Sequence, residues 1–201
     1  MSRPHPALLL LVCAAPVLAQ QPGPPARAIA LPDTMGANFL VTDTLTATSG
    51  PADYDFLIGA WRFTFQARNR DGSFTPPFSG HWVFTAKQTG GGGVLIEDHW
   101  RPDDPSSTWD AGTWTYRAYN PDRKIWEMRG VNTNVGAWQP GLMWRAGDDR
   151  LLVEWYGAML VRFRYFAITP DRFLWRADAT FDGGKSWVRD YWTMDVHRIS
   201  R

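Results

Sequence analysis

Glu97 and His99 are the two residues best placed by type and spacing for acid–base chemistry. Two positions apart in a β-strand, they share one face with Leu95. If that face lines a buried cavity, the carboxylate and the imidazole can exchange protons with a substrate once burial shifts their pKa values. If it faces outward, the pair is solvated or Glu97 bonds a neighbouring arginine. The inward alternative predicts an enzyme, namely a hydratase, isomerase or hydrolase acting on a hydrophobic substrate.

Arginines and aromatic residues form a second set of candidates, suited to ligand binding. Arg162 and Arg164 share one face of an expected strand, and Arg176 follows in the next strand. Pointing inward, they would bind a carboxylate or another anion; pointing outward, they would form a charged barrel exterior. Aromatic residues line ligand pockets, and they also build cores. The candidate ligand-binding residues are Glu97, Trp114, Tyr156 and Arg162.

Several classes of chemistry lack the residues they need. The sequence has no Gly-x-Ser-x-Gly motif, and its single cysteine, Cys13, lies in the N-terminal apolar run. The glycine-rich stretch 90–93 lacks the lysine and the following helix of a phosphate-binding loop. No His-x-His or His-x-x-x-His spacing supports a zinc site, so we expect no metal. Nucleophilic catalysis and phosphate binding are therefore not predicted.

The N-terminus has the features of a secretory signal peptide. Arg3 precedes an apolar run over residues 7–15 and the small residue Ala19, after which we expect cleavage. The run is too short for a membrane span, which needs about 20 residues. We predict a signal peptide over 1–19, a linker rich in Pro, Ala and Thr over 20–52, and one domain over 53–201. The protein is then periplasmic or extracellular.

Charge and cysteine content restrict the partners of the exported chain. The full chain has a net charge of +1, and loss of Arg3 with the signal peptide makes the rest neutral. A neutral chain without a basic run does not suit nucleic acid, and no later segment suits membrane insertion. Without Cys13 no disulfide can form, so the core alone must stabilise the fold. We expect a small apolar molecule as the partner; the oligomeric state is left open.

From Asp53 onward the sequence predicts short strands separated by turns. The stretch 61–66 alternates apolar and polar residues, which is the period of a half-buried strand. Antiparallel strands in such number expose edges unless the sheet closes, so we predict an all-β, antiparallel up-and-down β-barrel of about ten strands. The expected strands are 61–66, 81–87, 94–101, 112–119, 124–131, 141–145, 151–156, 160–169, 172–181 and 186–198.

The octet over 180–187, Thr-Phe-Asp-Gly-Gly-Lys-Ser-Trp, resembles the Asp box, a hairpin motif of sialidases and other β-propellers. A sialidase propeller needs several blades and a cluster of arginines gathered from them, which a single Asp box cannot supply. Asp182 can instead bond back to the backbone, while Gly183 or Gly184 supplies a positive φ angle. We therefore interpret the octet as a hairpin and not as a glycosidase signature.

Four motifs, in order, resemble the DUF1579-like family of uncharacterised proteins. They are Asp-Phe-x-x-Gly-x-Trp over 55–61, a Gly-rich turn leading to Glu over 90–97, a Tyr-x-Pro turn before Trp over 119–126, and the hairpin over 182–187. This chain has Tyr-Asn-Pro where family members often have Tyr-Asp-Pro. The Gly-x-Trp element also resembles the lipocalin, or calycin, signature. The resemblance implies a calycin-like barrel over 53–201 and brings no established activity.

The calycin resemblance has two further implications for single residues. In lipocalins an arginine near the C-terminus packs on the Trp of the Gly-x-Trp element, here Trp61, and Arg198 or Arg201 could serve. Nitrobindin-type barrels are related in fold and hold haem iron through one histidine near the C-terminus, where His197 lies in this chain. Haem is the one cofactor that the resemblance suggests; no other cofactor is expected.

Together these features favour an exported barrel that binds a small, largely apolar ligand in an aromatic-lined cavity. No motif signals catalysis, so the sequence points to binding more than to an enzyme. The alternatives are the enzyme with Glu97 and His99, the nitrobindin-like haem barrel with His197, and a barrel filled by its own side chains that acts as a structural or interaction module.

Overall fold

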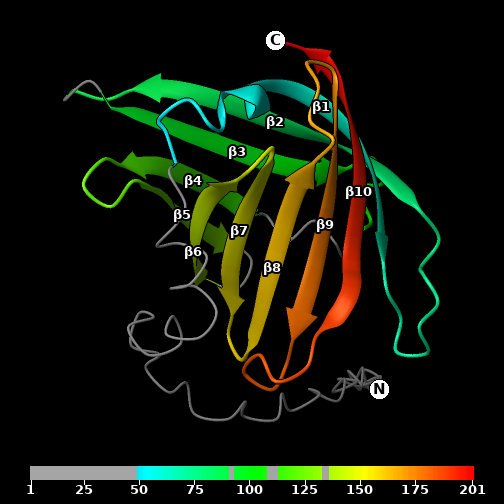
Figure 1. Cartoon of the computed structure of the whole chain (residues 1–201). Helices are drawn as coiled ribbons and strands as arrows, with labels where there is room; N and C mark the ends of the chain where they lie inside the picture. Colours follow the sequence, from blue (N-terminus) through cyan, green and yellow to red (C-terminus); the bar gives the residue numbers. More distant parts are fainter. Residues whose placement is uncertain (1–48, 91–92, 108–112, 133–135) are drawn as a thin grey trace, which may run out of the picture.

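A closed barrel of ten antiparallel strands forms the described part of the chain (Figure 1). The computed structural model describes residues 49–90, 93–107, 113–132 and 136–201. Each strand pairs with its neighbours in sequence and β10 pairs with β1, so the predicted all-β, up-and-down barrel is confirmed. The elements are η1, a 3-10 helix (Asp55–Leu57), β1 (Gly59–Ala67), β2 (Phe78–Gln88), β3 (Val94–Pro102), β4 (Thr113–Asn120), β5 (Ile125–Asn132), β6 (Ala137–Ala146), β7 (Asp149–Tyr156), β8 (Met159–Phe166), β9 (Arg172–Thr180) and β10 (Val188–Ser200).

The N-terminal predictions lie mostly outside the described residues. The signal peptide (1–19) and residues 20–48 of the predicted linker are not described. Ser49 and Gly50, also assigned to the linker, contact the barrel directly. The Ser49 carbonyl accepts a hydrogen bond from the Tyr119 hydroxyl at 2.8 Å, and the Gly50 carbonyl accepts one from Nε1 of Trp126 at 3.0 Å. These two residues of the predicted linker are therefore held against the barrel.

The main hydrophobic core lies inside the barrel, and a smaller buried cluster lies on the outer face of β5 to β8. In β1, Trp61, Phe63 and Phe65 are buried, whereas Arg62 and Thr64 are exposed. Successive side chains of a strand point to opposite faces of the sheet, so one face of every strand is turned toward the interior. Fully burying a side chain such as phenylalanine contributes roughly 1.5–3 kcal/mol. This apolar burial stabilises the barrel without disulfides.

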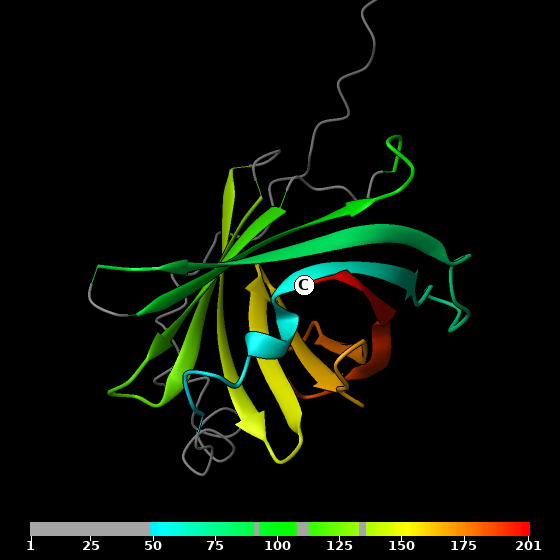
Figure 2. The same ribbon diagram turned by 90° about the horizontal axis from the view of Figure 1, so that it is seen from above.

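The helix η1 and the residue before it close one end of the barrel, as the view along the barrel shows (Figure 2). Tyr54 and Leu57 are fully buried. The Tyr54 hydroxyl donates to the carbonyls of Trp144 (3.1 Å) and Leu151 (2.9 Å), and Nε1 of Trp61 donates to the Leu57 carbonyl (2.6 Å). Buried polar groups require such partners. Residues 54–57, called the closing segment below, are therefore hydrogen-bonded to β6 and β7 on one side of the barrel and to β1 on the other.

Arg198 on β10 contacts both Trp61 and the backbone of the closing segment. Its guanidinium lies 3.9 Å from the centre of the Trp61 ring, a cation–π contact. The same guanidinium donates to the carbonyls of Phe56 and Ile58, each at 2.8 Å. The expected packing of a C-terminal arginine on Trp61 is confirmed, and Arg198 supplies it in place of the other candidate, Arg201.

In the hairpin between β9 and β10, the polar side chains and backbone N–H groups hydrogen-bond to one another. Asp182 accepts hydrogen bonds from the Ser186 backbone N–H (3.0 Å) and hydroxyl (2.7 Å), and Thr180 accepts one from the Gly184 N–H (2.9 Å). These bonds hold the pKa of Asp182 well below its usual range. Gly183 and Gly184 both adopt positive φ angles, 72° and 91°. The octet is thus a self-contained turn, as interpreted from the sequence.

Candidate ligand-binding cavity

A cavity of about 320 Å³ lies inside the barrel. All ten strands contribute side chains to its wall, and the helix η1 contributes none. The wall includes Tyr156 at the end of β7 and both Thr113 and Met159 at the beginnings of β4 and β8. These strand ends lie opposite η1 (Figure 1). The cavity therefore occupies the half of the barrel that the closing segment leaves unfilled.

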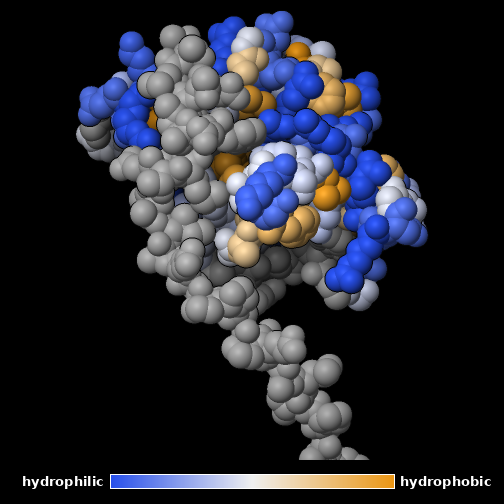
Figure 3. Space-filling model, turned by 60° about the horizontal axis from the view of Figure 1, so that its bottom comes forward, coloured by the Kyte–Doolittle hydropathy of each residue, from blue (hydrophilic) through white to orange (hydrophobic). Residues whose placement is uncertain are grey.

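The surface at this end of the barrel is mixed in character. Hydrophobic side chains stand among hydrophilic ones when this end is turned toward the viewer (Figure 3). Phe74 in the β1–β2 connection and Phe181 in the β9–β10 connection are exposed, as is Trp138 near the start of β6. Isolated exposed apolar residues are common on soluble proteins, so they alone do not mark a docking surface.

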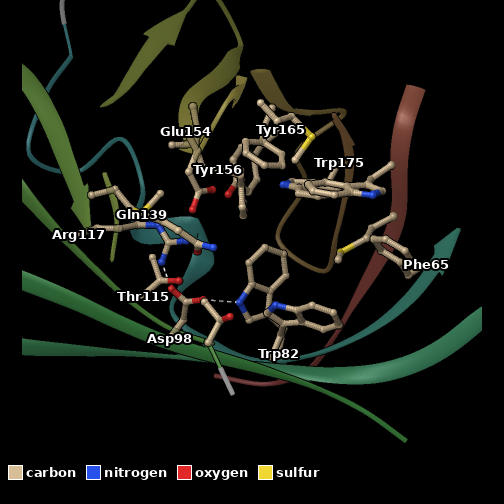
Figure 4. A pocket seen from close by; sticks show the side chains of 18 residues that line it. Phe65, Trp82, Asp98, Thr115, Arg117, Gln139, Glu154, Tyr156, Tyr165 and Trp175 are labelled. Atoms are coloured by element: carbon tan, nitrogen blue, oxygen red, sulfur yellow. Dashed lines mark hydrogen bonds and ion pairs between the residues drawn. The ribbon is translucent and has the colours of Figure 1, made fainter. Parts of the chain in front are cut away.

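One side of the cavity is aromatic. The Phe163 and Trp175 rings stack with centroids 4.8 Å apart, and the Trp82 ring meets Trp175 edge-on at 6.4 Å. Offset and edge-to-face pairs are the preferred geometries of aromatic rings, so this wall is well packed and rigid. The figure shows it opposite the polar side chains (Figure 4). The aromatic lining consists of Phe65, Trp82, Trp100, Phe163, Trp175 and Trp192, and the phenols Tyr156 and Tyr165 also line the cavity.

The other side of the cavity holds a buried ion pair. Asp98 and Arg117 are each 2% exposed and face each other from β3 and β4, with Nη1 of Arg117 bonded to Oδ2 of Asp98. The second oxygen of Asp98 accepts a hydrogen bond from Nε1 of Trp82 at 2.5 Å. Buried charges are tolerated when they are paired and hydrogen-bonded. Asp98 therefore has both of its oxygens occupied.

Glu154 lies next to this ion pair and is 6% exposed. Burial raises the pKa of Glu154 to about 7, against the opposing effects of a hydrogen bond from Tyr156 and the charge of Arg117. Burial and the neighbouring Glu154 also raise the pKa of Tyr156 well above its usual value. Near neutral pH the cavity thus contains a carboxyl group on the edge of ionisation beside a neutral phenol.

Three polar atoms of the wall make no hydrogen bond of ordinary length and angle with a described residue, although the Tyr165 hydroxyl lies near the side chains of both Arg117 and Trp175. They are Nε of Arg117, Oε1 of Gln139 and Nε1 of Trp175, and all three are buried. An unsatisfied buried polar group costs about 1–3 kcal/mol. A bound molecule that supplies partners would recover part of that cost, so the polar side of the cavity has spare hydrogen-bonding capacity.

Glu154 should make the protein less stable as the pH rises from about 4.5 to about 7. Its pKa in the unfolded chain is near 4.5 and in the folded protein about 7. The folded protein therefore keeps the proton in this range while the unfolded chain releases it, which favours unfolding. The contribution is full below pH 4.5 and is lost by pH 7, with a total change of about 3 kcal/mol.

Urea unfolding of wild-type protein and Glu154→Gln at about pH 5 and about pH 8 measures this effect. The variant should gain stability relative to wild type at the higher pH. Glu127→Gln is the matched control, since Glu127 lies on β5 outside the cavity lining. Its stability difference from wild type should not change in the same way. A constant difference between Glu154→Gln and wild type at both pH values would contradict the shifted pKa.

The structure places one of the four predicted ligand-binding residues, Tyr156, in the wall of the interior cavity. Glu97 and His99 lie on the outer face of β3, and Trp114 lies on the outer face of β4. Glu97 pairs with Lys87 at 2.7 Å, and the His99 ring stacks on Trp114 at 4.7 Å. All three line a separate hollow, formed mainly by outward-facing side chains of β2, β3 and β4. The inward orientation that the acid–base hypothesis needs is not the one observed.

Arg162 and His197 also lie outside the cavity. Arg162 bonds Asp178 at 2.8 Å and lies over the Trp187 ring, so it belongs to the charged exterior. His197 is exposed on β10 and contacts Asp195 at 3.1 Å. Among the residues that line the interior cavity there is no histidine. The arrangement therefore does not fit a haem held inside the barrel through His197.

Sequence reasoning did not select Asp98, Arg117 and Glu154, the charged residues of the cavity. A signal was present for the two carboxylates, because each lies at an inward position of its strand between two apolar or aromatic residues. Asp98 lies between Ile96 and Trp100, and Glu154 lies between Leu152 and Tyr156. A charged residue within a series of inward-facing apolar residues has two explanations: the strand's inner face has been assigned wrongly, or the residue marks a polar site inside the barrel.

The described residues include neither a cluster of metal-binding side chains nor a helix that could cross a membrane. No group of three or more His, Cys, Asp or Glu residues there could hold a metal ion. In the same part of the chain no helix is long and apolar enough to cross a membrane.

No family model and no curated protein matches this chain. Solved structures match with low identity. The S-type phycobiliprotein lyase CPES from Guillardia theta is 11% identical over 81% of this chain and 97% of its own, with a TM-score of 0.49. A DUF3598-family protein of unknown function from Nostoc punctiforme PCC 73102 is 12% identical over 72% and 48%, with a TM-score of 0.43. EF1p2_mFAP2b bound to DFHBI is 17% identical over 75% and 99%, with a TM-score of 0.30. The DUF1579-like resemblance stays a prediction.

Proposed function

We propose that the barrel binds a small, largely apolar molecule that carries one polar end. The observation that supports this is the cavity of about 320 Å³ with aromatic side chains on one side and buried charges on the other. Ligand sites are typically apolar cavities of roughly 300–1,000 Å³ with a few polar groups that fix orientation. The apolar body would lie against Trp82, Phe163 and Trp175, and the polar end would reach Arg117, Gln139 or Glu154.

A neutral fluorescent probe tests binding directly. N-phenyl-1-naphthylamine brightens in apolar surroundings, so a saturable increase on titration reports an accessible cavity. Met128→Trp should weaken its binding by about ten-fold or more, because the larger side chain projects from the wall into the cavity. Val83→Trp is the matched control on the outer face of β2, where Val83 is 48% exposed, and it should leave binding unchanged.

Circular dichroism and thermal unfolding establish that each variant is folded. The proposal fails if wild-type protein does not bind the probe. It also fails if folded Met128→Trp binds the probe as tightly as wild type, since the probe would then occupy some other place.

We further propose that the protein acts outside the cytoplasm, after export. The support is the basic, apolar and small-residue series over residues 1–19. Intact-mass measurement of protein recovered from the periplasm or the medium tests this. The expected product begins at Gln20; a full-length chain in the cytoplasm would contradict it.

A further inference from the structure

The charged groups of the cavity do not balance. Two carboxylates, Asp98 and Glu154, line it together with a single guanidinium, Arg117. Asp98 forms an ion pair with Arg117 through one carboxylate oxygen. Its other oxygen accepts a hydrogen bond from Nε1 of Trp82. Once this pair is counted, Glu154 remains as a second acid, and the described residues that line the cavity include no second base.

None of the ion pairs found among the described residues involves Glu154, although its carboxyl group points into the cavity (Figure 4). A buried carboxylate is costly unless a cation is beside it. Glu154 therefore has two ways to avoid that cost. It can hold a proton, or it can pair with a positive charge that the ligand brings.

Resting on the proposed function, we infer that the polar end of the ligand is a cation, an ammonium or protonated heterocyclic nitrogen, and that Glu154 is its counter-ion. An ammonium group would replace the proton on Glu154 and leave the cavity neutral overall. An anionic ligand would instead lie beside two carboxylates with only one guanidinium, already engaged, to offset them. A neutral ligand would not supply the missing charge.

The aromatic wall favours the same class of ligand. A cation over the face of a Trp or Tyr ring is attracted by the ring quadrupole, and the attraction grows where water is excluded. Trp82, Trp175 and Trp192 line the cavity together with Glu154. A flat cationic molecule would therefore find a counter-ion on one side and aromatic faces on the other.

The other ionisable groups around Glu154 leave its role unchanged. Tyr156 on the same strand and Tyr165 on β8 both have raised pKa values, because both are buried, so they stay neutral hydrogen-bonding groups. Among the described residues, Arg117 on β4 is the cation that acts on Glu154, and its charge is compensated by Asp98. Arg117 alone would repel a ligand cation; the Arg117–Asp98 pair presents no net charge to it.

Three indoles of nearly equal size and different charge test the inference. Tryptamine is a cation, tryptophol is its neutral alcohol counterpart, and indole-3-acetate is an anion. Isothermal titration calorimetry at about pH 8 should show tryptamine binding about ten-fold more tightly than tryptophol, with indole-3-acetate weakest. In Glu154→Gln the preference for tryptamine should fall to about two-fold or less. Glu127→Gln should keep the full preference.

The outcomes separate this inference from the proposed function. If wild-type protein binds neither an indole nor N-phenyl-1-naphthylamine, the proposed function itself fails. If the naphthylamine binds but tryptamine binds no better than tryptophol, or not at all, only the charge of the ligand is overturned. A tryptamine preference that persists in Glu154→Gln, folded by circular dichroism, would show that Glu154 is not the counter-ion.

Discussion

Replacing Arg117 with methionine should destabilise the protein by about 3–5 kcal/mol, because it leaves Asp98 buried without a cation. Both residues are 2% exposed, so water cannot solvate the remaining carboxylate. Trp82 would still donate its N–H to Asp98, but a single neutral hydrogen bond does not compensate a buried charge. The free energy of unfolding from urea denaturation near neutral pH measures the loss.

Two further variants identify the cause of that loss. The double variant Asp98→Leu, Arg117→Met should recover most of it, because an apolar pair of similar volume removes the unpaired charge. Arg172→Met is the matched control, since its pair with Asp195 is half-exposed, and it should cost about 1 kcal/mol or less. If Arg117→Met costs no more than Arg172→Met, the pair does not carry the buried charge described here.

Replacing Trp61 with alanine should have an effect of the same size, about 3–5 kcal/mol, because it removes a large, fully buried side chain at the closed end. The substitution deletes the hydrogen bond to the Leu57 carbonyl at 2.6 Å. It also deletes the edge-on contact with Phe173 at 4.9 Å and the cation–π contact of Arg198 at 3.9 Å. Thermal and urea unfolding should both show the loss.

Trp138→Ala is the control for this second variant, because Trp138 is 66% exposed and should change stability by about 0.5 kcal/mol or less. Trp61→Phe should fall between the two, since it keeps an aromatic ring but not the N–H. Equal stability of Trp61→Ala and Trp138→Ala would contradict the packing at the closed end.

The sequence was sufficient to predict the fold because the barrel repeats a simple local rule. Every strand is short, turn residues separate the strands, and each strand pairs with the next along the chain. In β1 the apolar residues Trp61, Phe63 and Phe65 alternate with polar ones, so one face is plainly the inner one. An open sheet would leave β1 and β10 as unpaired edge strands, so we expect the two strands to pair. The observed β1–β10 pairing confirms this expectation.

The site could not be predicted because several strands are apolar on both faces. In β7, Leu151, Val153 and Trp155 point outward, while the inward face carries Glu154 and Tyr156. Judged by polarity alone, the outward face of β7 is the better candidate for the interior. In β3 both faces carry ionisable residues. Only the register set by neighbouring strands decides which face lines the cavity, and a shift by one residue exchanges them.

The pairing of the first strand with the last sets a condition on how the chain can fold. Trp61 pairs with Arg198 in the β1–β10 register, a separation that spans almost the whole domain. Contacts between residues so far apart in sequence form slowly, because a long loop must close first. During synthesis β1 and the most recent strand both remain unpaired edges until the C-terminal residues emerge. A chain ending before β10 would keep both edges, so we expect such fragments to aggregate instead of forming a smaller barrel.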